Sequence, residues 1–180
     1  MKKFFSTLSL LLLSTVAARA AVFQAVAVDK SQITFSFKQM GVNIDGKFKR
    51  FHAQIQWDTT QPHQAKGGIE IDLNSIDTGS TEADQEVLSK SWFHVAAYPK
   101  ATFVLKSLRL LQGQSYEAKG LLTLKGQTRE VVAPATLTPQ GMLMGSFVLK
   151  RADYAIGEGM WAKFDVVANE ILVKFNLALQ

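Results

Sequence analysis

The stretch Gly120–Val132, GLLTLKGQTREVV, indicates the fold class because it joins two alternating segments through a glycine-containing turn. Leu122 and Leu124 share one face of the first segment, whereas Thr123 and Lys125 share the other. A turn at the central KGQ triplet would bring the second segment back antiparallel to the first. The stretch therefore predicts a β-hairpin whose leucines face a protein interior and whose threonine and lysine face outward.

The same alternation recurs along most of the chain and predicts about eight strands. Glycine, proline and polar residues separate the alternating segments, as is typical of antiparallel sheets. The predicted strands are Ser31–Lys38, Lys47–Trp57, Gly67–Leu73, Lys100–Ser107, Tyr116–Lys125, Arg129–Leu137, Met142–Lys150 and Asn169–Leu179. Loops are expected at Gly41–Gly46, Asp58–Lys66 and Arg151–Trp161.

Two segments depart from simple alternation. In Lys47–Trp57 the apolar residues change phase, which a β-bulge near Lys49 would explain, because bulges bend the strands of barrels. The segment Glu82–Ser89 is expected to form one short helix, since Thr81 and Asp84 have the spacing of a capping box.

This element pattern predicts an all-β, antiparallel fold, because strands follow one another without intervening crossover helices. Two architectures remain open at this point. An eight-stranded up-and-down barrel encloses a lumen wide enough for one small ligand, whereas a β-sandwich fills its core with side chains from two sheets. The twelve phenylalanines suit either architecture.

The start of the chain has the features of a secretory signal peptide. Two lysines at positions 2 and 3 precede an apolar run, Phe4–Val16, and the ARA triplet at 18–20 fits a small-x-small cleavage site. The apolar run is short for crossing a hydrocarbon core of about 30 Å. We therefore expect residues 1–20 to be removed, residues 21–180 to form one domain without a membrane span, and the protein to be periplasmic or secreted.

Charge and cysteine content narrow the functional classes. Outside the expected leader, 17 basic and 15 acidic residues leave a net charge of only +2, and the basic residues are scattered along the strands. A nucleic-acid-binding protein would show a basic stripe, so no nucleic-acid partner is expected. The absence of cysteine excludes disulfides, cysteine metal sites and thiol catalysis.

No motif in the sequence indicates catalysis. His52, His63 and His94 lack the spacing of a zinc site, and no G-x-S-x-G sequence is present. The KGQT sequence that begins at Lys125 has the wrong order for a phosphate-binding loop and precedes no predicted helix. We therefore expect a protein that is not an enzyme and that has no metal or cofactor.

Four groups of residues, in order along residues 31–161, carry a resemblance to a known family. They are Ser31-x-Ile33-x-Phe35 with Gly46-x-Phe48; Trp92-Phe93-x-Val95 with Tyr98-Pro99-x-Ala101-Thr102-Phe103; Gly120-x-Leu122-Thr123-x-x-Gly126-x-Thr128-x-x-Val131; and Arg151-x-Asp153-Tyr154-x-Ile156-Gly157-x-Gly159-x-Trp161. In these positions the chain resembles the YceI-like family of polyisoprenoid-binding or lipid-binding proteins. It departs from the family at His94, where the family usually has an aspartate.

The resemblance implies an extended lipocalin-like antiparallel barrel, periplasmic in bacteria, that holds a long isoprenoid or a similar amphiphile in its lumen. An isoprenoid quinone is one such ligand. The resemblance implies no catalytic residues, and it implies a homodimer as one assembly state.

Candidate ligand-binding residues follow from the apolar side of each strand and from the family motifs. The expected wall residues are Ile33, Phe35, Phe37, Ile55, Trp57, Ile69, Ile71, Phe103, Leu122, Leu124, Phe147, Ile171, Val173 and Phe175. The expected mouth residues are His94, Arg151, Asp153 and Trp161. For each wall residue plain core packing is an equal alternative, and for Arg151 and Asp153 a structural ion pair or turn contact is the favoured one.

The function that the sequence favours is non-catalytic binding, sequestration or transport of an isoprenoid or similar lipid in the periplasm. A second hypothesis is a packed β-sandwich that acts as a stress-protective or protein-interaction module without bound lipid. An enzyme that acts on a lipid in the lumen is a third.

Overall fold

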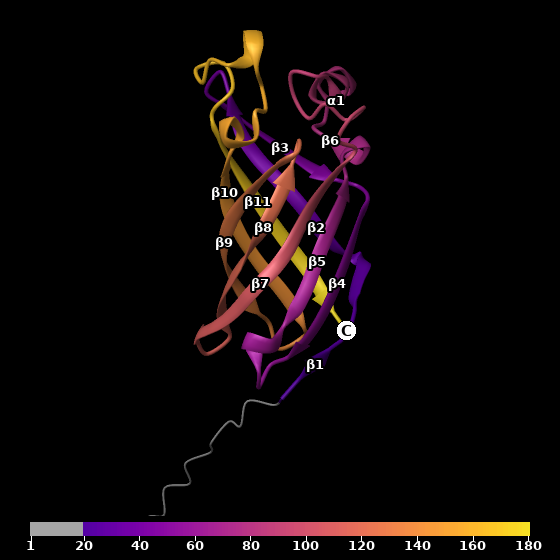
Figure 1. Cartoon of the computed structure of the whole chain (residues 1–180), viewed down its shortest axis with the longest axis vertical. Helices are drawn as coiled ribbons and strands as arrows, with labels where there is room; N and C mark the ends of the chain where they lie inside the picture. The colour runs from indigo at the N-terminus through magenta and orange to yellow at the C-terminus, as the bar shows by residue number, and fades with distance from the viewer. Residues whose placement is uncertain (1–19) are drawn as a thin grey trace, which may run out of the picture.

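The computed structural model describes residues 20–180 as one curled antiparallel sheet of eleven strands, a half-barrel (Figure 1). The expected signal peptide, apart from its last residue, lies outside the described residues. The strands run in the order β1-β4-β5-β7-β8-β9-β10-β11-β2-β3-β6. Their bounds are β1 Val22–Phe23, β2 Val26–Gln39, β3 Val42–Phe48, β4 Phe51–Asp58, β5 Lys66–Asp72, β6 Ile76–Asp77, β7 Lys100–Gln112, β8 Ser115–Leu124, β9 Gln127–Leu137, β10 Met142–Lys150 and β11 Glu170–Leu179.

The all-β, antiparallel class with one short helix is confirmed, but the number of eight strands is wrong. A single continuous sheet also excludes the two-sheet sandwich. The predicted strand Lys47–Trp57 is in fact the end of β3, a corner at Lys49 and Arg50, and then β4. The change of phase in the sequence marks this corner between two strands and not a bulge within one.

The strand β3 was missed because its inward face carries a glycine in place of an apolar side chain. Gly46 lies inside, and the ring of Phe35 on the paired strand β2 occupies the space that its side chain would fill. Met40 and Gly41, with φ angles of 48° and 81°, form the tight turn that joins the two strands. The predicted loop Gly41–Gly46 is therefore mostly strand.

The hairpin in Gly120–Val132 forms as predicted. Leu124 of β8 pairs with Gln127 of β9, and the two residues between them have positive φ angles, which match the right-handed twist of the strands. Leu122 and Leu124 are buried, whereas the hydroxyl of Thr123 meets that of Thr128 on the outer face at 2.8 Å.

Aromatic rings packed over glycines recur at two further places in the sheet. The ring of Phe103 on β7 lies against Gly120 on β8, and the ring of Phe175 on β11 lies against Gly145 on β10. A Cβ atom at either glycine would collide with the ring. Glycine therefore leaves the inward space that each phenylalanine ring needs, as in other sheets where an aromatic side chain covers a glycine.

The helix α1, Thr81–Leu88, and the 3₁₀ turns η2, Leu73–Ser75, η3, Arg151–Tyr154, and η4, Gly159–Trp161, connect strands at one end of the half-barrel (Figure 1). A fourth turn, η1, Pro62–Gln64, follows β4. The N-cap of α1 is Ser80, whose hydroxyl accepts a hydrogen bond from the Ala83 amide, so the predicted cap at Thr81 is displaced by one residue. Asp84 instead accepts hydrogen bonds from the amide and hydroxyl of Thr78.

The interior of the half-barrel contains two apolar clusters. A lower cluster, at the end where β1 and the C-terminus lie, includes Trp57, Leu108, Tyr116 and Leu143. An upper cluster, at the end covered by α1, has these buried members: Leu73, Trp92, Val95, Ala101, Leu122, Leu124, Leu149, Tyr154, Ile156 and Val167. We use the names lower core and upper cluster for them below.

Replacing Gly145 by alanine tests the glycine–aromatic packing. The new Cβ atom would meet the ring of Phe175 and would lie 2.6 Å from the carbonyl oxygen of Pro134. We expect a loss of about 1–3 kcal/mol in the free energy of unfolding, because overpacking outweighs the usual gain from replacing glycine in a strand. Urea denaturation measures it.

The matched control is Gly67→Ala, whose Cβ atom meets no aromatic ring and lies 3.1 Å from the nearest atom, the Gln54 carbonyl oxygen. If Gly145→Ala lowered the free energy of unfolding by no more than this control does, the packing argument would be contradicted.

Candidate ligand-binding cavity

A cavity of about 580 Å³ occupies the upper part of the half-barrel, beneath α1. Seven strands, β2, β3, β5, β6, β8, β10 and β11, contribute lining residues, and so do α1, η2, η3 and η4 with their neighbouring segments. The wall is almost entirely aliphatic and aromatic. This volume is within the range of about 300–1,000 Å³ that holds small organic ligands in proteins.

Eleven of the eighteen wall and mouth residues expected from the sequence lie around this cavity. They share the inward side of their strands, or they belong to the segment between β10 and β11. They are Ile33, Phe35, Phe37, Ile71, Leu122, Leu124, Phe147, Arg151, Trp161, Ile171 and Val173. Their part in ligand binding stays a prediction, but the structure brings them together.

Seven expected residues lie away from the cavity, one of which, Asp153, is described with Arg151 below. Ile55 and Trp57 belong to the lower core, and Ile69 and Phe175 pack against it. Phe103 packs against the upper cluster, beside Gly120. His94 is in the loop after α1, where its ring meets that of Tyr98 edge-on at 5.7 Å. The five apolar ones face inward as expected, but they lie too deep along the half-barrel to line the cavity.

The sequence reasoning missed the residues that connecting segments contribute. Most come from β3, η2, β6, α1 and the loops that follow α1, η3 and η4, and two, Gln39 and Leu149, come from the strands β2 and β10. The additional lining residues are Gln39, Phe48, Leu73, Ile76, Thr78, Ser80, Glu82, Ala83, Glu86, Val87, Trp92, Phe93, Leu149, Ile156 and Val167. Phe48, the Trp92-Phe93 pair and Ile156 stood in the motifs quoted above, and those motifs were an available signal for them.

Arg151 organises the wall opposite α1. Its side chain is 1% exposed, and its guanidinium donates five hydrogen bonds of 2.7–3.1 Å to backbone carbonyls. The accepting carbonyls are those of Ile156, Gly157, Trp161, Val167 and Ala168. All five N–H donors of arginine are thus satisfied, and the segment 156–168 is wrapped around one side chain.

Arg151 makes no ion pair with a carboxylate in the part of the chain that the structure describes. The rings of Trp92 and Phe164 lie 5.7 Å and 5.1 Å from its central carbon, which gives the cation two aromatic neighbours. Burial lowers the pKa of Arg151. The turn-contact alternative for this residue is therefore the observed one, and Asp153 is exposed and does not line the cavity.

Lys125 differs from its expected outward position. Its side chain is buried. Its ammonium group donates hydrogen bonds to the Ala155 carbonyl at 2.5 Å and to the Glu158 carboxylate at 2.8 Å. The hydrogen bond from Lys125 lowers the pKa of Glu158. The hairpin turn is thereby tied to the segment that Arg151 holds.

Polar groups of the cavity gather at its rim. Thr78, Ser80, Glu82 and Glu86 all come from α1 and the residues just before it. Across the rim, the indole N–H of Trp161 donates a hydrogen bond of 2.8 Å to Glu86. The cavity thus has an apolar interior and a polar edge on the side of the helix.

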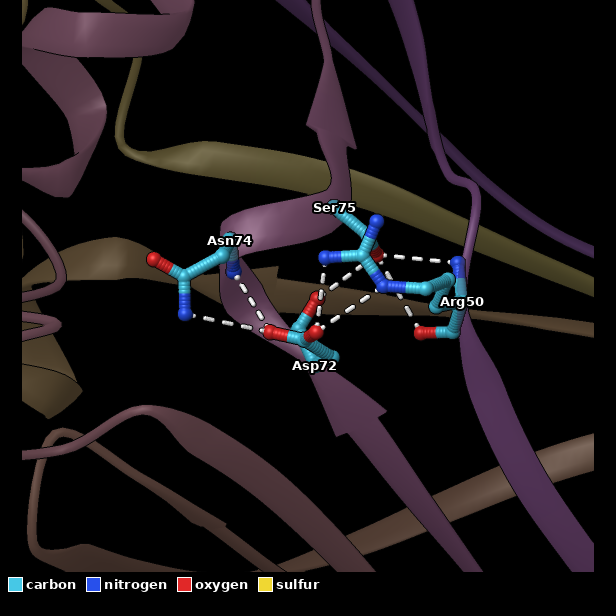
Figure 2. A network of polar contacts seen from close by, with 4 residues as sticks. All are labelled: Arg50, Asp72, Asn74 and Ser75. Atoms are coloured by element: carbon cyan, nitrogen blue, oxygen red, sulfur yellow. Dashed lines mark hydrogen bonds and ion pairs between the residues drawn. The ribbon is translucent and has the colours of Figure 1, made fainter.

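A polar network fixes the turn from which this rim begins (Figure 2). Arg50 at the β3–β4 corner donates two hydrogen bonds to Asp72, at 2.8 and 3.0 Å, and Asp72 also accepts from the backbone and side chain of Asn74. The Ser75 hydroxyl accepts from the Arg50 amide at 2.9 Å. The hydrogen bonds that the Asp72 carboxylate accepts, above all from Arg50 and then from Asn74, lower its pKa. They join the corner to η2, which places Leu73 in the cavity wall.

His94 has a backbone role. Its φ angle is 51°, in the left-handed region that favours histidine, asparagine and aspartate over most non-glycine residues. Its carbonyl accepts hydrogen bonds from the amides of Ala97 and Tyr98. Histidine is therefore compatible with this turn, which lies away from the cavity.

Within residues 20–180, no group of three or more histidine, cysteine, aspartate or glutamate side chains is arranged to hold a metal ion. None of the helices in that same range is long and apolar enough to cross a membrane.

Comparison with known proteins identifies the family. The family model of the YceI-like domain matches residues 25–179. The chain belongs to the YceI-like family. The resemblance expected from the sequence is thereby confirmed. "Protein YceI" of Salmonella arizonae is 33% identical over 140 residues, which cover 75% of this chain and 71% of that protein.

Solved structures show the same fold. The crystal structure of Burkholderia cenocepacia BcnA has a TM-score of 0.82 and 34% sequence identity, and it covers 84% of this chain and 98% of that one. A polyisoprenoid-binding domain from Saccharophagus degradans, implicated in plant cell wall breakdown, has a TM-score of 0.64 at 18% identity, with 87% of this chain and 97% of that one covered.

Replacing Arg151 by methionine tests its structural role. The substitution keeps an unbranched side chain but leaves buried carbonyls without donors, so we expect a loss of at least about 3 kcal/mol in the free energy of unfolding. The control is Arg109→Met, because Arg109 is 65% exposed and pairs with Glu117 on the surface, an interaction worth less than about 1 kcal/mol. Equal losses in the two variants, measured by urea denaturation, would show that Arg151 does not hold the segment.

Proposed function

We propose that this protein binds a long-chain isoprenoid or a similar amphiphilic lipid in the cavity of the half-barrel, without catalysis. The observation that carries the proposal is the cavity itself, which has an apolar wall, about 580 Å³ of space and a polar rim on one side. Its YceI-like fold, shared with a domain described as polyisoprenoid-binding, supports lipid binding in general.

The cavity suits an amphiphile with one polar end. Apolar carbons gain about 0.8 kcal/mol per CH₂ when they leave water, and Phe35, Leu122 and Val173 offer such surroundings in the interior. A polar end group would lose its hydration in that interior, but it can meet Thr78 and Ser80 at the rim. The chain of the lipid would therefore enter first, and its head would stay near α1.

The energetics favour exchange over permanent storage. A lipid chain in a bilayer is already removed from water, so its transfer to an apolar cavity changes the free energy little. A protein with such a site can take up a lipid and release it again. We therefore propose sequestration or transport of lipid as the role.

The cellular setting is part of the proposal. The expected signal peptide supports export, with the domain 21–180 acting in the periplasm, and the lack of cysteine is compatible with that compartment. We also propose that the protein forms a homodimer and has no nucleic-acid partner. The lipid is proposed as its ligand, without a cofactor, and no catalytic residue is assigned.

Leu122→Asp should abolish lipid uptake, because it would place a carboxylate in the apolar wall. Thr123→Asp should leave uptake unchanged, because Thr123 lies on the outer face of the sheet. Uptake is measured with a labelled isoprenoid quinone, after circular dichroism has shown that each variant folds. Val173→Phe, which adds bulk inside the cavity, gives a second test if Leu122→Asp does not fold.

Organic extracts of the purified wild-type protein, examined by mass spectrometry, should contain a lipid. An empty extract together with no uptake of the labelled quinone would refute the proposed function. Loss of uptake in Thr123→Asp but not in Leu122→Asp would reverse the assignment of inner and outer faces.

A further inference from the structure

Four exposed apolar side chains gather at the end of the half-barrel where the rim of the cavity lies. Met40 and Val42 come from the β2–β3 hairpin, and Met160 and Phe164 come from the segment between β10 and β11. Their exposed fractions are 77%, 62%, 82% and 51%, and the first three are the highest among the large apolar side chains that the structure describes. We call these four residues the apolar tip. Apolar side chains that gather in water indicate a surface that meets a partner.

The apolar tip borders the mouth of the cavity. Gln39 and Trp161 line the cavity, and Met40 and Met160 are their immediate neighbours in the chain. Val42 pairs with Gln39 across the hairpin, so these two side chains share one face of the sheet. In Figure 1 the β2–β3 turn and the segment between β10 and β11 stand at the same end as α1, on the opposite side of the view.

Hydrogen bonds hold the two parts of the tip together. The amide of Met40 donates to the carbonyl of Val166 at 2.8 Å, which joins the hairpin turn to the segment that carries Phe164. Arg151 fixes the same segment by donating to the carbonyl of Trp161 at 2.7 Å, and its central carbon lies 5.1 Å from the ring of Phe164. The tip is therefore presented on a backbone that the structure holds in place.

Met40 breaks two preferences at once. It is the first residue of a two-residue hairpin turn, with a φ angle of 48°, and Gly41 follows at 81°. Asparagine before glycine is preferred in such a turn, because both residues need positive φ angles, which methionine adopts only at a cost. The methionine side chain is also left in water. A residue that is unfavourable in both respects is typical of a position retained for function.

We propose that the apolar tip inserts into the surface of a phospholipid bilayer and so brings the mouth of the cavity to the source of its lipid. The inference rests on the proposed function, because a lipid that leaves a bilayer for the cavity has to pass this mouth. A stable protein–protein interface involves about 20–30 residues on each side, whereas the tip offers four side chains on two projecting connections. Such a shape suits insertion between lipid headgroups.

The charges beside the tip are compatible with a phospholipid surface. Lys38 and Lys163 flank it, and neither forms an ion pair within residues 20–180. Their ammonium groups can meet lipid phosphates while their methylene groups lie along the apolar side chains. Asp165 is the one acidic residue among residues 38–42 and 159–166, and the neighbouring Glu158 is already paired with Lys125.

The tip is tested with the double variant Met40→Asn with Met160→Ser, by flotation with vesicles of phosphatidylcholine and phosphatidylglycerol. Wild-type protein should float with the vesicles, and the variant should have a partition coefficient lower by at least about tenfold, because two inserted side chains are lost. Asparagine suits the positive φ angle of residue 40, so the variant should unfold at a urea concentration no lower than the wild type does.

The matched control is Met144→Ser with Val148→Ser. It removes two apolar side chains, 43% and 56% exposed, from β10, away from the lining of the cavity. Its partition coefficient should equal that of the wild type. The inference would be overturned by a wild-type protein that does not float, by a tip variant that floats as well as the wild type, or by an equal loss in the control.

Two further measurements separate this inference from the proposed function. Uptake of a labelled isoprenoid quinone from solution, without vesicles, should be equal in the wild type and the tip variant, because neither methionine lines the cavity. Transfer of the quinone from donor vesicles to the protein should be at least about tenfold slower in the variant. No uptake by the wild type would refute the proposed function, whereas normal uptake with an unchanged transfer rate in the variant would refute the membrane contact alone.

Sedimentation velocity tests whether a second copy of the chain covers the tip instead. The wild type and the tip variant should have the same oligomeric state in the absence of vesicles. A wild-type dimer that the Met40→Asn and Met160→Ser replacements dissociate would assign the tip to an interface between copies and would overturn the inference.

Discussion

An inward-facing apolar residue on a curled sheet is stabilised only if something apolar lies opposite it. A two-layer fold provides a second sheet or a row of helices, but this half-barrel must fill its interior with its own inward side chains. In the lower half it does so with large rings such as Trp57 and Tyr116, which meet across the lumen. In the upper half the walls, represented by Phe147 and Val173, enclose about 580 Å³ that the protein does not fill. The division between a solid and a hollow half is the basis of the proposed lipid binding.

The hollow half needs a wall that does not collapse, and Arg151 supplies much of it. An isolated buried cation is costly, yet here five carbonyl groups and two aromatic rings surround it. The arginine fixes the segment 156–168, which has little regular structure of its own. Lys125 and the contact between Trp161 and Glu86 then tie this segment to the hairpin turn and to α1. The cavity persists because polar contacts around it hold its irregular walls.

The sequence predicted which side of each strand faces inward, but not how deep each residue lies. Ile55 and Ile71 both alternate correctly, and yet one belongs to the lower core and the other lines the cavity. Depth depends on the register and tilt of the strands, which the period of two residues does not contain. The alternation of apolar residues also did not predict the positions of residues near turns. Lys125 turns back and donates a hydrogen bond to Glu158, 33 residues further along the chain. Gly46 interrupts the apolar alternation of its strand, because the ring of Phe35 occupies the inward space beside it.

The position of a bound chain tests the account most directly. The three tryptophans divide between the two halves, with Trp57 in the lower core and with Trp92 and Trp161 at the cavity. In variants that each retain one tryptophan, an isoprenol with a bromine at its tail end would quench nearby fluorescence. The account predicts strong quenching of Trp92 and little quenching of Trp57. Equal or stronger quenching of Trp57 would show that the chain passes into the lower half, and would contradict the division into a filled and a hollow half.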